Sequence, residues 1–173
     1  MSNLAYQAML YARAAHAEQR RKYTNNPYVD HLAEVAGIVS AVAADQFAVS
    51  ADTMIAVAWL HDCVEDQGVP LMEIESRFGI MVALGVSGLS DMEQGNRAER
   101  KRLSRERLAA CSGWIQTIKC ADVISNTSSI VEHDPAFAKV YLEEKRLLLD
   151  VLMKADPRLR DIAAMQAAGE RKS

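Results

Sequence analysis

Apolar residues recur at helical spacing along almost the whole chain, and this pattern is the strongest constraint on its fold. Nothing longer than a few residues alternates between apolar and polar positions as a strand would. Aromatic residues make up only 6% of the chain, while alanine is abundant. This bias favours helix, because Ala, Leu, Met, Glu and Arg lose little free energy on entering one. We therefore predict an all-α fold, a bundle of about eight or nine helices with no sheet.

Capping residues and helix breakers divide this pattern into segments. Ser50 suits the N-cap of a helix that is apolar on nearly every side and therefore belongs in the centre of the domain, and Asp30 suits the N-cap of the helix before it. Pro opens several of the later helices and Gly79 ends one. The predicted helices span about residues 5–18, 31–44, 51–60, 70–78, 80–89 and 114–131, a basic segment covers 97–110, and C-terminal helices cover 135–166.

Length and composition predict one cytoplasmic domain. The 173 residues fit a single buried core, and no repeat or Ser/Gly-rich linker divides them, so we predict one domain over 1–173. The net charge of −3 directs the protein neither to nucleic acid nor to an anionic membrane. The longest apolar stretch, 78–89, is too short and glycine-rich to cross a bilayer. Three cysteines without CxxC spacing, and a start unlike a secretion signal, predict reduced thiols and a cytoplasmic location. The sequence leaves homo-oligomer formation open.

Three carboxylates lie within five residues directly after a helix that is apolar enough to be buried. The segment reads His61-Asp62-Cys63-Val64-Glu65-Asp66. Helical spacing would place His61, Asp62, Glu65 and Asp66 on one face or at its edge. Repulsion and desolvation make such crowding costly unless a cation offsets it, and a divalent metal would do so. A solvated acidic helix end is the alternative, and for an isolated His-Asp pair it is the commoner explanation.

Two more polar residues stand among apolar neighbours. Asp122 lies within the apolar stretch 118–124, where a lone carboxylate would be costly but a metal ligand would not. His31 opens a helix from which a neutral imidazole can point into the core, and a hydrogen-bonded core histidine is the alternative. His16 and His133 have no partner at motif spacing, so we predict both at the surface. Cys63 is predicted to be a packing residue and not a nucleophile.

The order of these residues resembles the HD superfamily of metal-dependent phosphohydrolases. The hydrolase domain of RelA/SpoT enzymes is the narrower match, and the length resembles the small alarmone hydrolases within that group. This resemblance covers about residues 5–145. It rests on Arg21-Lys22, Pro27-Tyr28-Val29-Asp30-His31, His61-Asp62-Cys63-Val64-Glu65-Asp66, Phe78-Gly79 and Asp122-Val123-Ile124-Ser125-Asn126.

The resemblance implies a manganese centre with an acidic pair beside it. Its ligands would be His31, His61, Asp62 and Asp122. Glu65 would be the general base that activates water, and Asp66 its partner. Two imidazoles and two carboxylates suit a divalent ion with open positions, although this donor set does not separate Mn from Fe, Co or Zn.

The resemblance also implies a set of nucleotide-binding residues. Asn126 lies one helical turn beyond Asp122, and Arg97 opens a segment, 97–107, that holds six basic residues against two acidic ones. Such a surface suits a substrate with several phosphates. Solvated helix ends are the alternative for most of these residues. Nucleic acid ranks lower because no aromatic residue interleaves the basic ones. The implied set is Arg21, Lys22, Arg97, Asn126 and Tyr141, while Ser128 stands where the family often has Arg.

Together these features predict an enzyme acting on a nucleotide. The predicted reaction is hydrolysis of the 3′-pyrophosphate of an alarmone, (p)ppGpp or (p)ppApp, with release of pyrophosphate. One alternative is a phosphatase for another nucleotide, for example one that removes the 2′-phosphate of NADPH. The other is a nucleotide-sensing module without turnover, against which the costly Glu65–Asp66 pair argues.

Overall fold

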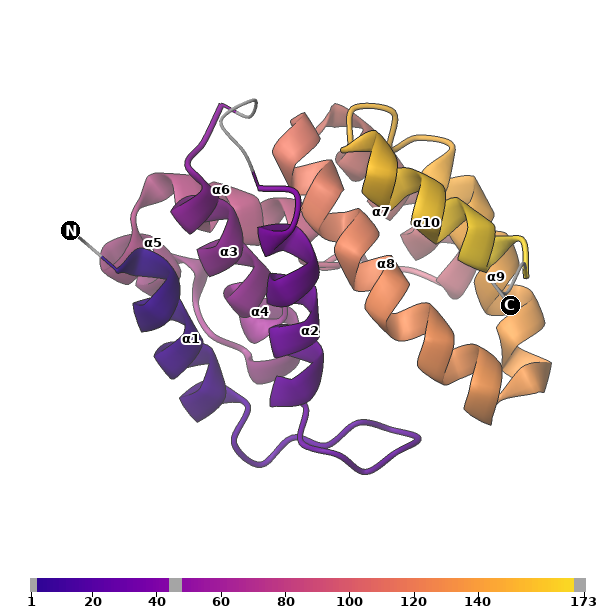
Figure 1. The fold of residues 1–173 in the computed structure, drawn as a ribbon, viewed down its shortest axis with the longest axis horizontal. Helices are drawn as coiled ribbons and strands as arrows, with labels where there is room; N and C mark the ends of the chain where they lie inside the picture. Colours follow the sequence, from indigo (N-terminus) through magenta and orange to yellow (C-terminus); the bar gives the residue numbers. More distant parts are fainter. Residues whose placement is uncertain (1–2, 44–47, 170–173) are drawn as a thin grey trace. The chain divides into compact units, whose positions relative to one another are not determined.

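The described residues form an all-α protein, as predicted (Figure 1). The computed structural model describes residues 3–43 and 48–169. Within these ranges a single β-bridge between Arg20 and Pro27 is the only pairing of extended backbone. No helix in the described part of the chain is long and apolar enough to cross a membrane. The helices are α1 (Leu4–Ala15), α2 (Val29–Ser40), α3 (Ala51–Leu60), α4 (Cys63–Gln67), α5 (Leu71–Phe78), α6 (Ile80–Leu89), α7 (Arg97–Ala110), α8 (Gly113–His133), α9 (Pro135–Leu149) and α10 (Pro157–Ala167).

Helix ends agree with the sequence in some places and differ in others. Ser50 caps α3 as predicted, since its side chain accepts the backbone N–H of Thr53. The predicted cap of α2 is wrong: Tyr28 occupies the N-cap, and Asp30 lies inside the first turn, where a negative charge also interacts favourably with the helix dipole. This helix ends at Ser40, and the predicted end at residue 44 lies outside the described residues.

The chain divides into two compact units. The first comprises the residues up to Arg21 together with Asn25–Met92, and it contains α1 to α6. The second comprises Lys22–Thr24 and the residues from Glu93 onward, and it contains α7 to α10. Each unit is described separately below.

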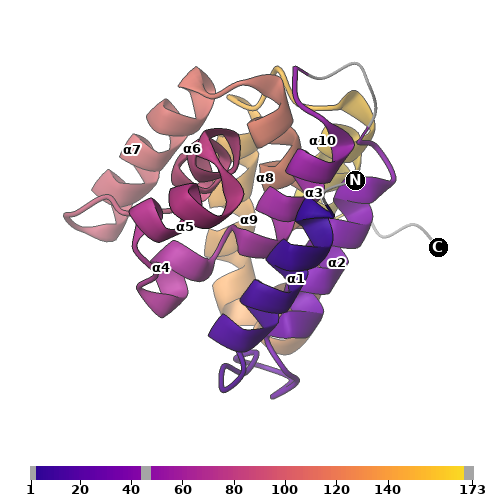
Figure 2. The ribbon, with the colours of Figure 1, turned by 90° about the vertical axis from the view of Figure 1, so that its left-hand side faces the viewer.

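Helix α3 forms the centre of the first unit. It packs against α1, α2 and α6, and Figure 2 shows α1 and α2 running beside it. Six of its ten residues are buried, among them Met54, Val57 and Leu60 with no exposed surface. The prediction of a central apolar helix is therefore confirmed. Since α3 ends at Leu60, it delivers His61 and Asp62 directly from this core.

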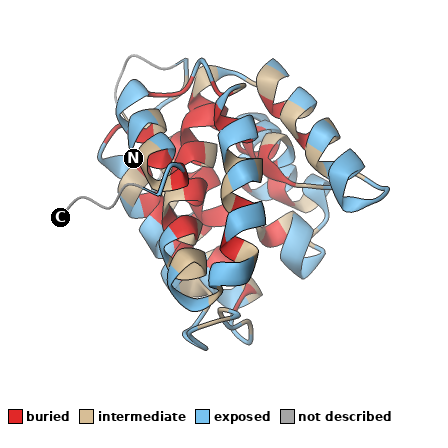
Figure 3. Ribbon diagram, turned by 90° about the vertical axis from the view of Figure 1, so that its right-hand side faces the viewer, coloured by how far each residue is buried: buried red, intermediate tan, exposed pale blue. Residues whose placement is uncertain are grey.

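Helix α8 has the same role in the second unit, where it packs against α7, α9 and α10. It begins at Gly113, where only glycine fits because a Cβ would collide with the backbone carbonyl of Lys154. Buried Gln116 on α8 connects two neighbouring segments through its side chain. Its amide nitrogen donates to Leu108 O (2.9 Å), and its amide oxygen accepts the backbone N–H of Lys154 (2.8 Å). Figure 3 shows that most helices carry their buried residues on one side.

Candidate metal centre and substrate surface

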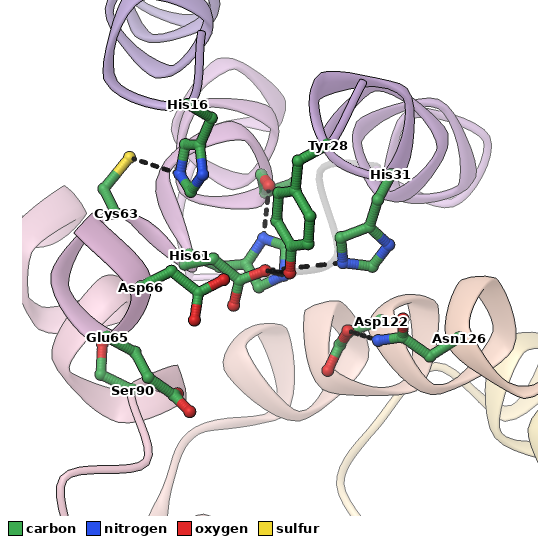
Figure 4. A network of polar contacts seen from close by, with 12 residues as sticks. His16, Tyr28, His31, His61, Cys63, Glu65, Asp66, Ser90, Asp122 and Asn126 are labelled. Atoms are coloured by element: carbon green, nitrogen blue, oxygen red, sulfur yellow. Dashed lines mark hydrogen bonds and ion pairs between the residues drawn. The ribbon is translucent and has the colours of Figure 1, made fainter. Parts of the chain in front are cut away.

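In the first unit, two histidines direct their rings at one carboxylate. The Nε2 atom of His61 lies 3.0 Å from Asp62 Oδ2, and that of His31 lies 3.5 Å from the same oxygen. The two rings meet edge to face with centroids 5.4 Å apart, and both histidines are buried (Figure 4). The structure thus brings together three of the four predicted ligands.

A backbone contact decides which nitrogen of His61 can bind an ion. The Nδ1 atom lies 2.8 Å from the carbonyl oxygen of Ala58, which can only accept, so Nδ1 carries the proton. A neutral His61 then turns the lone pair of Nε2 toward the carboxylate of Asp62. Two electron pairs facing each other in a buried site repel unless a cation lies with them. Imidazole nitrogens and a carboxylate oxygen, with a carbonyl fixing the tautomer, are a donor set that fits a divalent metal.

Tyr28 supports this centre, although from the sequence we placed it only within a motif and assigned it no role. Its hydroxyl donates to Asp62 Oδ2 over 2.7 Å. The phenol ring meets His31 edge to face on one side and stacks on His16 on the other, with centroid distances of 5.3 Å for both pairs. Its backbone N–H donates to Gln19 O (2.9 Å). The start of α2 is therefore bound both to the segment that follows α1 and to a predicted metal ligand.

The acidic pair lies on a separate short helix, α4. The chain leaves the α3 spiral at His61, and Asp62 becomes the N-cap of the new helix, accepting at its carbonyl the N–H of Asp66 (2.9 Å). This break adds a helix to the number predicted, and it replaces the single continuous face predicted for the segment. Glu65 accepts the backbone N–H of Asp91 (2.9 Å), and Asp66 accepts the side-chain N–H of Gln19 (2.8 Å). Both residues are exposed, so water can reach them.

The predicted surface position of His16 is wrong. The residue is only 1% exposed, because the end of α1 directs its ring between Tyr28 and Cys63. Its spacing shows why: His16 follows Ala8 and Ala12 at intervals of four, and both alanines are fully buried. The periodic pattern of α1 therefore contained this information. His133 is exposed as predicted.

Cys63 is a packing residue, as predicted. It has no exposed surface, and burial together with the nearby charges of Asp62 and Asp66 raises the pKa of its thiol to about 12. The thiol therefore stays protonated at neutral pH. A protonated, inaccessible sulfur is a poor nucleophile.

In the second unit, Asp122 lies on α8 and is 7% exposed. Lys119 Nζ donates to its Oδ2 (2.9 Å), and Asn126 Nδ2 donates to its Oδ1 (2.7 Å; Figure 4). The predicted placement of Asn126 one turn beyond Asp122 is therefore what the helix shows. Because Asp122 belongs to the second unit and His31 and His61 to the first, an ion shared among them is part of the proposal below.

Three predicted substrate residues surround Phe137, which the sequence analysis missed. The guanidinium carbon of Arg97 lies 5.2 Å and Lys22 Nζ 5.9 Å from the centre of the Phe137 ring. The centroid of the Tyr141 ring lies 6.2 Å from that of Phe137, and the Tyr141 hydroxyl lies 3.3 Å from Thr127 Oγ1. Cations beside aromatic rings are a common surface for a base or a phosphate. The remaining predicted residue, Arg21, lies in the first unit, where its backbone N–H closes a turn onto Asn26 O (2.9 Å).

Carboxylates already neutralise part of the basic segment. Two N–H groups of Arg97 donate to the two oxygens of Glu144 (2.7 and 2.8 Å), and this hydrogen bonding raises the pKa of Arg97. Arg102 pairs with Glu99 (2.7 Å), and Arg107 with Glu93 (2.6 Å). Arg97 must therefore share its guanidinium with Glu144 if it is to hold a phosphate.

Comparisons with known proteins agree with this site. The HD domain family matches residues 8–114. The chain is 32% identical over 130 residues to the guanosine-3′,5′-bis(diphosphate) 3′-pyrophosphohydrolase MESH1 of Drosophila melanogaster, a match that covers 75% of this chain and 70% of that protein. For MESH1 of Danio rerio the identity is 35% over 117 residues, covering 67% and 63%. The chain belongs to the HD domain family, in its RelA/SpoT group. The resemblance drawn from the sequence is thus confirmed.

Solved structures give the same relationship. One, described as a metazoan ortholog of SpoT that hydrolyses ppGpp and plays a role in starvation responses, matches this HD-domain chain with a TM-score of 0.85 and 27% identity, covering 99% of this chain and 98% of that one. A protein of Listeria monocytogenes EGD-e matches with a TM-score of 0.68 and 19% identity, covering 87% and 100%. The second likeness is one of fold alone.

Proposed function

We propose that this HD-domain protein hydrolyses the 3′-pyrophosphate of alarmone nucleotides and releases pyrophosphate. The observation that carries the proposal is the approach of two buried imidazole nitrogens, from His31 and His61, to one oxygen of Asp62. The relatives that carry the name guanosine-3′,5′-bis(diphosphate) 3′-pyrophosphohydrolase support ppGpp as the substrate. We include (p)ppApp because the reacting pyrophosphate is the same and only the base differs.

The proposed metal ligands are His31, His61, Asp62 and Asp122. Asp122 supplies a second carboxylate from an otherwise apolar helix, where hydrogen bonds from Lys119 and Asn126 to its two oxygens offset part of the cost of burying it. Manganese is the ion we propose, because the resemblance to RelA/SpoT hydrolases implies it and the mixed nitrogen and oxygen donor set suits it. When bound, such an ion acts as a Lewis acid on the phosphate and lowers the pKa of the attacking water.

The chain's own carboxylates then move the proton. Glu65 is the proposed general base, and the backbone N–H of Asp91 donates to its carboxylate and orients it. Asp66 lies one residue further on and supports the same water. General base catalysis of this kind contributes about 10²–10⁴ in rate.

The proposed nucleotide surface combines residues from the basic and aromatic cluster. Lys22 and Arg97, both beside the Phe137 ring, would hold the base or the phosphates, while Arg21, Asn126 and Tyr141 complete the set. We also propose a cytoplasmic location. All three cysteines of the chain are free thiols, which suits a reducing compartment.

Product analysis tests this function. Protein loaded with Mn²⁺ is incubated with pppGpp, ppGpp, ppApp and NADPH, and the products are identified by mass. We expect pyrophosphate from the three alarmones. Glu65→Gln should lower kcat by about 10²–10⁴, His61→Ala should lower it further because it removes a metal ligand, and the exposed His133→Ala should match wild type.

Three outcomes would contradict the proposal. Orthophosphate released from NADPH without alarmone turnover would favour the phosphatase alternative. Tight alarmone binding without any product would favour the sensing module. Equal rates for wild type and His61→Ala would show that the proposed centre plays no part in the reaction.

A further inference from the structure

A chain of side-chain hydrogen bonds runs from the core of the first unit to the acidic pair. The thiol sulfur of Cys63 lies 3.6 Å from His16 Nε2. On the other side of the ring, His16 Nδ1 lies 2.5 Å from Gln19 Oε1. Gln19 Nε2 in turn lies 2.8 Å from Asp66 Oδ2. Neither His16 nor Gln19 belongs to the set of residues that the mechanism above uses.

The chemistry of the groups fixes the direction of every bond in this chain. The carboxylate of Asp66 can only accept, so the amide nitrogen of Gln19 faces it and donates. The amide oxygen of Gln19 then faces His16 and can only accept, so Nδ1 of the histidine carries a proton. In its neutral form the ring accepts at Nε2, and the thiol of Cys63 donates to it. Each group therefore donates to the next in the order Cys63, His16, Gln19, and the last hydrogen bond is accepted by Asp66.

This chain of hydrogen bonds is held by packing at its inner end and by a further hydrogen bond at its outer end. His16 is 1% exposed and Cys63 has no exposed surface, so the inner end cannot rotate freely. The ring of His16 also stacks on Tyr28, which binds the predicted metal ligand Asp62. At the outer end, the oxygen of Gln19 accepts a second hydrogen bond, from Gln67 Nε2 (2.6 Å).

We infer that Gln19, oriented by His16, is a positioning residue that holds the carboxylate of Asp66 beside Glu65 for the hydrolytic step. The inference rests on the proposed function. Without Gln19, the exposed carboxylate of Asp66 loses its side-chain hydrogen bond to the segment that follows α1 and can adopt other rotamers. Gln19 does not touch the metal ligands in any of the contacts described, so its effect falls on Asp66.

Two substitutions remove the N–H donor of the Gln19 side chain while keeping its length. Gln19→Glu keeps an oxygen for His16 and Gln67 but turns a second carboxylate toward Asp66, whereas Gln19→Met keeps the length and removes both polar atoms. We expect each to lower kcat for ppGpp by about 10–100-fold, the range for residues that orient catalytic or metal-binding groups. KM, the affinity for Mn²⁺ and the unfolding temperature should stay near wild type. The matched control is Gln7→Met, on the exposed face of α1.

The outcomes against this inference are distinct from failure of the proposed function. A kcat for Gln19→Met equal to that of Gln7→Met, or a loss of activity matched by a fall in unfolding temperature or Mn²⁺ affinity, would overturn the positioning role. If wild type releases no pyrophosphate, the proposed function fails, and NMR of the Gln19 side-chain amide still decides the contact. Asp66→Ala should shift those resonances and Glu65→Ala should not. An unchanged Gln19 amide in Asp66→Ala overturns the inference whatever the substrate.

Discussion

The position of Asp62 Oδ2 also depends on groups outside the proposed ligand set. This oxygen accepts the hydroxyl of Tyr28 at 2.7 Å and faces His61 Nε2 at 3.0 Å. The hydroxyl donates, so it satisfies one lone pair of the oxygen and limits rotation of the carboxylate. Tyr28 itself is held by the stacked ring of His16 and by its backbone bond to Gln19. Several residues of the first unit that are not proposed ligands therefore fix the orientation of the Asp62 carboxylate.

Tyr28→Phe tests that role at a single atom. Removing the hydroxyl keeps the ring stacked on His16 but leaves the carboxylate of Asp62 less constrained. We expect the affinity for Mn²⁺ to fall by about 10-fold, because partners that orient a metal ligand typically contribute 10–100-fold. Calorimetric titration of Mn²⁺ measures it, with Tyr6→Phe, 51% exposed on α1, as the control. Equal affinities in the two variants would show that Tyr28 does not orient Asp62.

Sequence spacing predicted the residues of the centre but not the residues that hold them. His31, His61 and Asp62 follow from polar residues placed in apolar helices, a pattern visible within each element. Gln19 and Asp66 are 47 residues apart, and their contact depends on where the segment that follows α1 meets α4. No periodicity within one helix reports such a meeting. The same holds for Phe137, whose two cations come from other segments.

At the scale of elements, the break between α3 and α4 was not predicted from the sequence. The sequence predicts that the apolar helix ends near residue 60 but that helical spacing continues through Asp66, since neither Gly nor Pro interrupts these residues. The break occurs where the side chains of His61 and Asp62 turn toward each other and toward His31. By contrast, the breakers Pro70 and Gly79 bound α5 as predicted, because Pro lacks a backbone donor and Gly79 has a φ of 88°.

Gly113 offers a test of how α8 packs in its unit. A Cβ at this position would overlap the backbone carbonyl of Lys154, so Gly113→Ala must shift backbone. We expect it to lower the free energy of unfolding by about 1–3 kcal/mol, as overpacking commonly does. Gly37→Ala is the matched control: it lies on the exposed face of α2, and its Cβ would meet nothing within 4 Å. That variant should raise the stability by about 0.5–1 kcal/mol. Urea denaturation of both measures the difference, and equal midpoints would contradict this packing.

At the scale of the whole molecule, the proposed ligands come from both compact units. His31, His61 and Asp62 belong to the first unit, and Asp122 belongs to the second. The chain was predicted to form one domain over residues 1–173, and this stays a prediction. The composition shows no linker between the two units. Neither composition nor residue spacing, however, predicts whether the two units unfold as one domain. An ion bound by ligands from both units would join them in a single unfolding transition.

Metal-dependent stability tests that coupling directly. An ion that binds only the folded protein stabilises it by about 2.7 kcal/mol when its concentration is a hundred times Kd. We therefore expect Mn²⁺ to raise the unfolding temperature of wild type and a chelator to reverse the rise. Asp122→Asn should greatly weaken the response, because it removes the charged oxygen of the ligand from the second unit, whereas the exposed Asp150→Asn should respond as wild type does. The measurement is thermal unfolding followed by circular dichroism at several Mn²⁺ concentrations, with calorimetry to count the transitions. If Asp122→Asn keeps the full response, the ion is held by the first unit alone and Asp122 is not a ligand.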